Sequence, residues 1–152
     1  MKKKNFVNEL FSLDGKTVVL TGSAGRLGSR FAHVLCESGA NVILVDNDAN
    51  KNIKLKSELS KKYNTICEVF DIDITNESSV SEMVKKIIKK FKKIDVLINN
   101  AHFVPRDHPK RDFPFEKYPL DLWNETVNTN LQGLFLCSRE IGRIMVKQNR
   151  GV

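Results

Sequence analysis

Residues 17–28 read TVVLTGSAGRLG, and this stretch decides the fold. Its first five residues form a short, β-branched apolar run that is typical of a buried strand. Glycines follow at positions 22, 25 and 28, and a helix is predicted over 26–38 with Gly39 as its stop signal. The apolar residues that repeat at helical spacing in this helix are Leu27, Phe31, Val34 and Leu35. The stretch therefore predicts a strand, a tight turn and a helix in immediate succession.

The rest of the chain continues this alternation. Further buried strands are predicted over 41–46, 65–72 and 94–98, with intervening helices over 50–63 and 78–92. The first of these helices is expected to turn Ile53, Leu55 and Leu59 inward, and the second has an apolar face opposite a lysine-rich face. A charged loop with several prolines, over 102–119, precedes a long helix predicted over 120–148.

Buried strands that alternate with helices imply an α/β fold with a doubly wound parallel sheet. Right-handed crossovers give the strand order 3-2-1-4. We expect one domain over 1–152, with an N-terminal tail over 1–13, since neither a repeat nor a second domain is visible.

Composition narrows the functional classes. The net charge is +7, but the basic residues are spread over the wet faces of predicted helices, so we expect no nucleic-acid partner. The three cysteines form no CxxC pair and the three histidines add no ligand pair, so we expect reduced thiols and no metal. No signal peptide or membrane span is evident, and a cytoplasmic location is expected.

The glycine turn has a chemical use. Glycine allows the tight turn and lets the backbone approach a pyrophosphate, and the helix N-terminus offers free N–H groups to phosphate oxygens. A phosphate loop of the nucleoside-triphosphatase kind is disfavoured, because no Gly-Lys-Ser/Thr follows.

Asp46 ends the second predicted strand, 24 residues after Gly22. A carboxylate at this place can accept hydrogen bonds from an adenosine ribose, although aspartate is also a common turn former. Two classes remain at this point: dinucleotide-binding proteins, and methyltransferases that bind S-adenosylmethionine.

Three more motifs favour the first class. They are DIDITN at 71–76, NNA at 99–101 and NTNLQG at 128–133. With TGSAGRLG they resemble, in order and spacing, the short-chain dehydrogenase/reductase family, whose cofactor domain is a Rossmann fold, from about Leu13 to Val152. The resemblance implies that Asp73 and Ile74 lie along the adenine, and that Asn100 and Ala101 pass beneath the cofactor. It also implies that Asn130 is the asparagine of the catalytic helix, which shapes the helix and holds a water in the proton relay.

The cofactor-binding residues expected on these grounds are Gly22, Ser23, Gly25, Arg26, Leu27, Gly28, Asp46, Asn47, Asp73, Ile74, Asn100 and Ala101. We expect NAD rather than NADP, because Asp46 would repel a 2′-phosphate, whereas Arg26 would favour one. The long helix over 120–148 has apolar residues on more than one face, and the resemblance implies a homo-oligomer through it.

Two departures from the family pattern affect the expected activity. The middle glycine falls at Gly25, as in the branch that acts on nucleotide sugars, which hints at a substrate from sugar or polysaccharide biosynthesis. The family's proton donor is a tyrosine with a lysine four residues later, but Tyr63 and Tyr118 are followed at that distance by Cys67 and Leu122.

Residues 150–152 resemble the lead-in to a fifth strand. We therefore expect the chain to be the cofactor-binding half of an NAD(P)-dependent oxidoreductase, and we expect this half to be inactive alone. The alternatives are a non-catalytic nucleotide-binding module and an S-adenosylmethionine methyltransferase.

Overall fold

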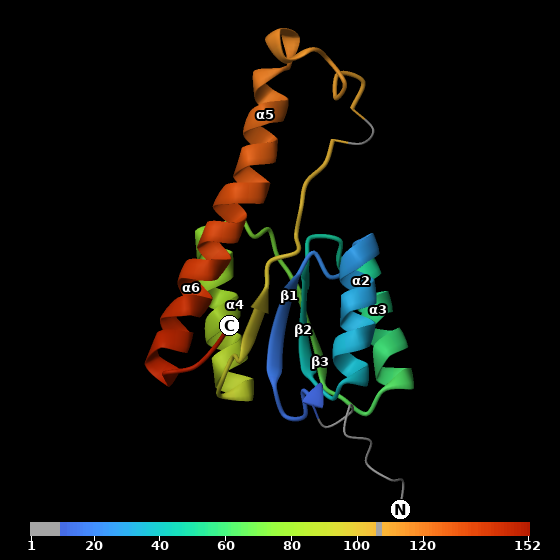
Figure 1. The fold of residues 1–152 in the computed structure, drawn as a ribbon, viewed down its shortest axis with the longest axis vertical. Coiled ribbons are helices and arrows are strands. Elements are labelled where there is room, and N and C mark those ends of the chain that lie inside the picture. The colour runs from blue at the N-terminus through green and yellow to red at the C-terminus, as the bar shows by residue number, and fades with distance from the viewer. Residues whose placement is uncertain (1–9, 106–107) are drawn as a thin grey trace, which may run out of the picture.

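A parallel sheet forms the centre of the molecule (Figure 1). The computed structural model describes residues 10–105 and 108–152, so most of the expected N-terminal tail lies outside the described residues. The strands are β1 (Thr17–Thr21), β2 (Asn41–Asp46), β3 (Cys67–Asp71) and β4 (Val96–Ile98). All pairs are parallel and the order is β3-β2-β1-β4, which confirms the predicted topology.

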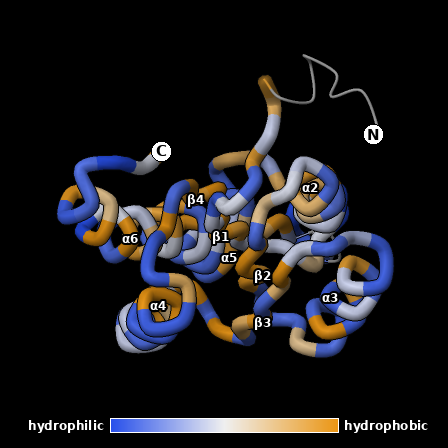
Figure 2. The backbone as a smooth tube through the Cα atoms, turned by 90° about the horizontal axis from the view of Figure 1, so that it is seen from below, coloured by the Kyte–Doolittle hydropathy of each residue, from blue (hydrophilic) through white to orange (hydrophobic). Residues whose placement is uncertain are grey.

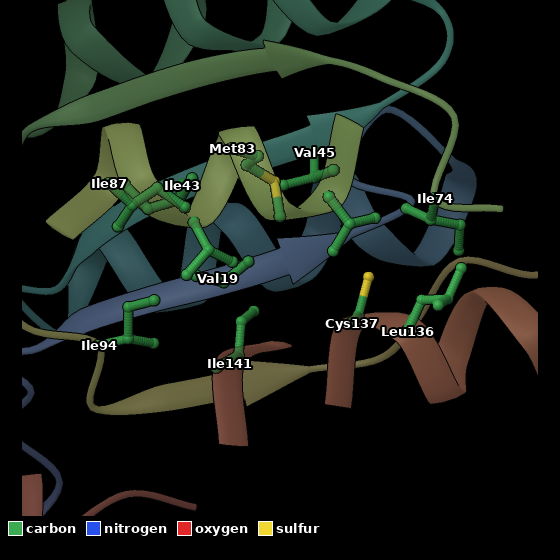
Figure 3. Close-up of a cluster of buried hydrophobic side chains, with 12 residues drawn as sticks. Val19, Ile43, Val45, Ile74, Met83, Ile87, Ile94, Leu136, Cys137 and Ile141 are labelled. Carbon is green, nitrogen blue, oxygen red and sulfur yellow. The ribbon is translucent and has the colours of Figure 1, made fainter. Parts of the chain in front are cut away.

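Helices cover both faces of the sheet (Figure 2). One face packs against α2 (Arg26–Glu37) and α3 (Ala49–Lys62), and the other against α4 (Glu77–Phe91) and α6 (Leu134–Gln148). Side chains of β1 alternate between the two layers: Val18 and Leu20 face α2, whereas Val19 joins the α4 and α6 side (Figure 3). The doubly wound arrangement follows from strands that are apolar on both faces.

Two connections begin their helices with side-chain caps. Asp48 accepts a hydrogen bond from the Lys51 N–H at 3.0 Å at the start of α3. Asn76 accepts from the Ser79 N–H at 3.0 Å at the start of α4. These caps satisfy N–H groups that the helix itself leaves unpaired.

The buried face of α2 differs from the sequence pattern. Gly28, Ala32 and Cys36 face the sheet, whereas Leu27 and Val34 are 56% and 61% exposed and Phe31 is also exposed. The cause is the close approach of the helix to the turn. A Cβ atom on Gly28 would lie 2.0 Å from the Gly22 carbonyl oxygen, so only glycine fits at this position.

A second difference concerns α3. Leu55 and Leu59 face inward as predicted, but Ile53 is exposed and Asn52 is fully buried in its place. By contrast, the apolar face predicted for α4 is confirmed: Val80, Met83, Val84 and Ile87 are buried.

The helix predicted over 120–148 consists of three consecutive segments: α5 (Leu120–Val127), the π-helical η2 (Asn128–Gly133) and α6. Figure 1 shows this long rod running past the end of the sheet, with α5 beyond it. A short 3-10 turn, η1 (Phe115–Lys117), precedes α5. A Cβ atom on Gly133 would lie 2.6 Å from Ile74 Cδ1, so the wide turn comes very close to the loop after β3.

The outer edge of β4 pairs with the last residue of the chain. The Leu97 N–H donates to the Val152 carbonyl at 2.9 Å, and the Val152 N–H donates to the Asp95 carbonyl at 3.1 Å. Residues 150–152 therefore begin to extend alongside β4, as their resemblance to a strand lead-in implies.

Candidate functional site

A cleft of about 750 Å³ opens at the carboxyl ends of the strands. It lies where the chain order reverses between β1 and β4, the place at which open α/β sheets bind ligands. Eleven of the twelve residues expected to bind a cofactor line it. They are Gly22, Gly25, Arg26, Leu27, Gly28, Asp46, Asn47, Asp73, Ile74, Asn100 and Ala101.

The glycine turn is held against the loop that follows β4. The Asn100 side chain donates to the carbonyls of Thr21 and Gly22 at 3.0 and 3.1 Å. In return, Thr21 Oγ1 accepts from the backbone N–H groups of Asn100 and Ala101. Gly22 has φ +65°, and a Cβ atom there would lie 2.7 Å from Ala101 Cα, so the position requires glycine on both counts.

The N-terminus of α2 faces this cleft. Its N-cap residue is Gly25, no side chain caps the helix, and the first turn contains no acidic residue. The N–H groups of the first turn and the positive end of the helix dipole are therefore available to an anion. Arg26 adds a guanidinium at the same rim.

Asp46 is fixed in orientation by two backbone N–H groups. Its Oδ2 accepts from the Ala24 N–H at 2.8 Å, and its Oδ1 accepts from the Asp48 N–H at 3.0 Å. Each carboxylate oxygen has a second lone pair, so the group can still accept hydrogen bonds from a ligand hydroxyl. This geometry suits the ribose role that the sequence predicts.

Lys51 also lines the cleft, and sequence reasoning missed it. Its Nζ lies 2.6 Å from Asp48 Oδ2, and the hydrogen bond with Lys51 lowers the pKa of that exposed carboxyl. The sequence could have indicated Lys51, because it follows Asp46 by five residues and so falls in the first turn of the helix after β2. The remaining lining residues come mainly from loops and from the long helix: Ala24, Val45, Asp48, Ile72, Thr75, His102, Phe103, Val104, Glu125, Asn128 and Thr129.

Two predicted site residues do not line the cleft. Ser23 is fully buried, and its hydroxyl donates to Asn52 Oδ1 at 2.7 Å. The side chain of Asn130 bonds to the backbone of Phe103, which itself lines the cleft. The structure thus places Ser23 beneath the turn and Asn130 behind the wall of the cleft.

The cysteines are remote from the cleft lining. Cys36 and Cys67 are buried with their Sγ atoms 3.5 Å apart, and burial raises the pKa of Cys137 to about 12. Among the described residues, no group of three or more histidine, cysteine, aspartate or glutamate side chains could hold a metal ion. Over the same ranges, no helix has both the length and the apolar character needed to cross a membrane.

The family described as short chain dehydrogenase matches residues 16–152. The chain belongs to the short-chain dehydrogenase/reductase family. Its relatives include the sorbose reductase of Candida albicans, 31% identical over 145 residues, with 95% of this chain and 50% of the relative covered. The NADP-dependent mannitol dehydrogenase of Alternaria alternata is 33% identical over 142 residues, with 90% of this chain and 50% of the relative covered.

Solved structures of the family agree with the fold. NAD⁺-bound xylitol dehydrogenase has a TM-score of 0.82 and 29% identity, and the match covers 91% of this chain and 51% of that chain. The present chain thus spans about half the length of the relatives it matches. Membership in this family of oxidoreductases implies a nicotinamide dinucleotide, NAD or NADP, as the cofactor.

Proposed function

We propose that this chain is the cofactor-binding half of an NAD(P)-dependent oxidoreductase. The observation that carries the proposal is the uncapped N-terminus of α2, which opens into the cleft directly behind a turn that only glycine can form. A pyrophosphate needs backbone N–H donors and close backbone approach, and this turn supplies both.

The site's own geometry fits a dinucleotide. Cβ atoms at Gly22 and Gly28 would collide with backbone atoms. Glycine at both positions therefore allows a tight turn whose backbone a pyrophosphate can approach closely. The N–H groups at the start of α2 would hold the pyrophosphate, Asp46 would accept from the adenosine ribose, and Asp73 with Ile74 would border the adenine. When bound, the cofactor supplies hydride transfer.

NAD is the cofactor we propose, in preference to NADP. Asp46 is held rigidly by the Ala24 and Asp48 N–H groups, so it cannot easily move away from a 2′-phosphate. Arg26 and Lys51 oppose this preference, but Lys51 is already paired with Asp48. The names of the relatives include both an NADP-dependent enzyme and an NAD⁺-bound one.

Binding without turnover is the behaviour we propose for the 152 residues. Carbonyl reduction needs a hydride on carbon and a proton on oxygen, and the proton donor is worth about 10²–10⁴ in rate. The Tyr63 hydroxyl lies 3.3 Å from His33 Nδ1 on the α2 and α3 side, and neither Tyr63 nor Tyr118 lines the cleft. Asn130 would act by holding the cleft wall rather than by proton transfer.

The substrate class we propose for the whole oxidoreductase is a polyhydroxylated sugar or sugar derivative. Gly25 gives the glycine spacing of the nucleotide-sugar branch, and three of the relatives are named for sorbose, mannitol and xylitol.

Calorimetry of the purified chain with NAD⁺, ADP-ribose and S-adenosylmethionine tests the proposal. We expect ADP-ribose to bind, because the residues proposed to contact its adenosine, ribose and pyrophosphate all line the cleft, and we expect no carbonyl reduction with NADH. Preferential binding of S-adenosylmethionine would favour a methyltransferase instead. Carbonyl reduction by the purified chain would contradict the proposed lack of turnover.

A further inference from the structure

Asn52 is a fully buried polar residue on the inward face of α3. It precedes Leu55 by three residues and Leu59 by seven, so helical spacing places all three on the same apolar face. An apolar side chain would be expected at this position. Burial of an unpaired amide is costly, so its presence demands specific hydrogen-bond partners.

Both ends of the Asn52 amide have such partners. Its Oδ1 accepts from the Ser23 hydroxyl at 2.7 Å, and its Nδ2 donates to the Leu44 carbonyl at 3.1 Å. One side chain therefore joins the glycine turn, β2 and α3. The contact spans 29 residues of sequence and lies directly beneath the phosphate-binding turn.

Ser23 is therefore held by hydrogen bonds from both its backbone and its side chain. Its backbone N–H donates to the Val45 carbonyl at 3.2 Å, while its hydroxyl is bound to Asn52. The next residue, Ala24, donates its N–H to Asp46. These hydrogen bonds fix the glycine turn relative to β2 and use the N–H groups of Ser23 and Ala24. The first N–H groups of α2 have no side-chain cap and stay available to a ligand.

We propose that Asn52 is a positioning residue for the cofactor: through Ser23 it sets the place of the glycine turn, and with it the N–H groups of α2, over the sheet. The inference rests on the proposed dinucleotide function. A displacement of the turn by a fraction of an ångström misaligns N–H donors whose hydrogen bonds depend steeply on distance and angle. Cofactor affinity should therefore depend on a residue that does not line the cleft.

A purely structural role predicts a different result. Such a pair would contribute to the free energy of unfolding and leave the affinity of the folded chain unchanged. Two measurements on the same variants separate the roles: the dissociation constant for ADP-ribose by calorimetry, and the unfolding midpoint by circular dichroism. Binding is measured well below each variant's midpoint.

The variants are Ser23→Ala, Asn52→Ala, the double variant, and Asn50→Ala as a matched control on the exposed side of α3. We expect Ser23→Ala and Asn52→Ala each to weaken ADP-ribose binding about two- to tenfold, the range for one lost hydrogen bond. The double variant should bind no more weakly than the worse single variant, since both changes remove the same Ser23–Asn52 hydrogen bond and Asn52→Ala also removes the bond to the Leu44 carbonyl. Asn50→Ala should bind as the wild type does.

Wild-type affinity in both folded single variants would overturn the inference, whatever their stability. Ser23→Ala removes one oxygen atom and keeps the test valid if Asn52→Ala does not fold. Amide hydrogen exchange without ligand gives an independent readout, because the Ser23 and Ala24 N–H groups should exchange faster in Ser23→Ala. If the wild type binds no dinucleotide, the proposed function fails, and unchanged exchange in Ser23→Ala would then refute the positioning of the turn itself.

Discussion

Asn130 holds both backbone hydrogen-bonding groups of Phe103. Its Oδ1 accepts from the Phe103 N–H at 2.7 Å, and its Nδ2 donates to the Phe103 carbonyl at 3.0 Å. The Asn130 amide thus pairs with the Phe103 backbone as a neighbouring strand would, and Phe103 lines the cleft. It stands in the π-helical η2, where the wider turn changes the direction in which side chains leave the helix.

Asn130→Ala should loosen this loop. We expect faster amide exchange at Phe103 and a loss of about 1–3 kcal/mol in the free energy of unfolding, because a half-buried N–H and carbonyl lose their partner. Asn128→Ala, in the same π-helical segment, serves as the control and should leave Phe103 exchange unchanged. Equal exchange in the Asn130 variant and the wild type would show that the loop holds itself.

Gly28→Ala should disrupt the turn. The new methyl group would sit 2.0 Å from the Gly22 carbonyl oxygen and 2.9 Å from Ser23 Cα, so α2 must move away from the glycine turn. We expect a loss of about 1–3 kcal/mol in the free energy of unfolding by urea denaturation. Gly142→Ala is the matched control in α6, where nothing lies within 4 Å of the added atom. There we expect a gain of about 0.5–1 kcal/mol. A neutral Gly28→Ala would contradict the described packing.

The sequence predicts the order of the strands correctly, because the spacing of apolar residues and the turn-forming glycines are local features of the chain. Eleven of the residues expected to bind a cofactor line one cleft, and their binding role stays a prediction. The inward faces of α2 and α3 were harder to predict. Phe31 is turned outward because α2 packs through Gly28, which lies too close to the Gly22–Ser23 turn for any side chain. Ile53 is exposed and Asn52 is buried instead, because a partner 29 residues away satisfies the Asn52 amide. Both causes are contacts in the folded chain, and the residues next to Phe31 and Asn52 in the sequence do not reveal them.

Self-association through the long helix remains a prediction, and the structure sharpens it. Trp123, Leu131 and Phe135 are 53%, 63% and 55% exposed along α5, η2 and α6. Each large side chain that becomes buried in a dimer would contribute about 1.5–3 kcal/mol. We expect sedimentation velocity to show a dimer that Leu131→Glu converts to a monomer. Val34→Glu places the same charge on an exposed apolar site of α2 and should leave the dimer intact. A wild-type monomer at tens of micromolar would refute this interface.

Asp95 should make the fold sensitive to acid. Its burial opposes ionisation, but the Thr17 N–H at 2.9 Å and the Lys93 ammonium at 3.0 Å outweigh that effect and hold the pKa of Asp95 below its ordinary value. A carboxyl whose pKa is lower in the folded state stabilises the fold above its unfolded pKa, and this stabilisation is lost as the pH falls through the folded pKa. The stability advantage of wild type over Asp95→Asn should therefore be constant near pH 6 and shrink below about pH 4. An advantage that persists unchanged to pH 2 would exclude this role.

The choice between NAD and NADP should depend on Asp46. Its carboxylate faces the cleft in an orientation that the Ala24 and Asp48 N–H groups fix. At an effective dielectric near 20, two unit charges 4 Å apart repel by about 4 kcal/mol, and a third of that gives about a tenfold preference for NAD. Asp46→Asn removes the charge and keeps one of the two acceptor oxygens, so we expect calorimetry to show a rise in the ratio of NADP⁺ affinity to NAD⁺ affinity. Glu82→Gln is the control, because it removes the charge of an exposed carboxylate of α4 that does not line the cleft. Equal affinity of the wild type for both cofactors, or an unchanged affinity ratio in Asp46→Asn, would show that Asp46 does not set the choice of cofactor.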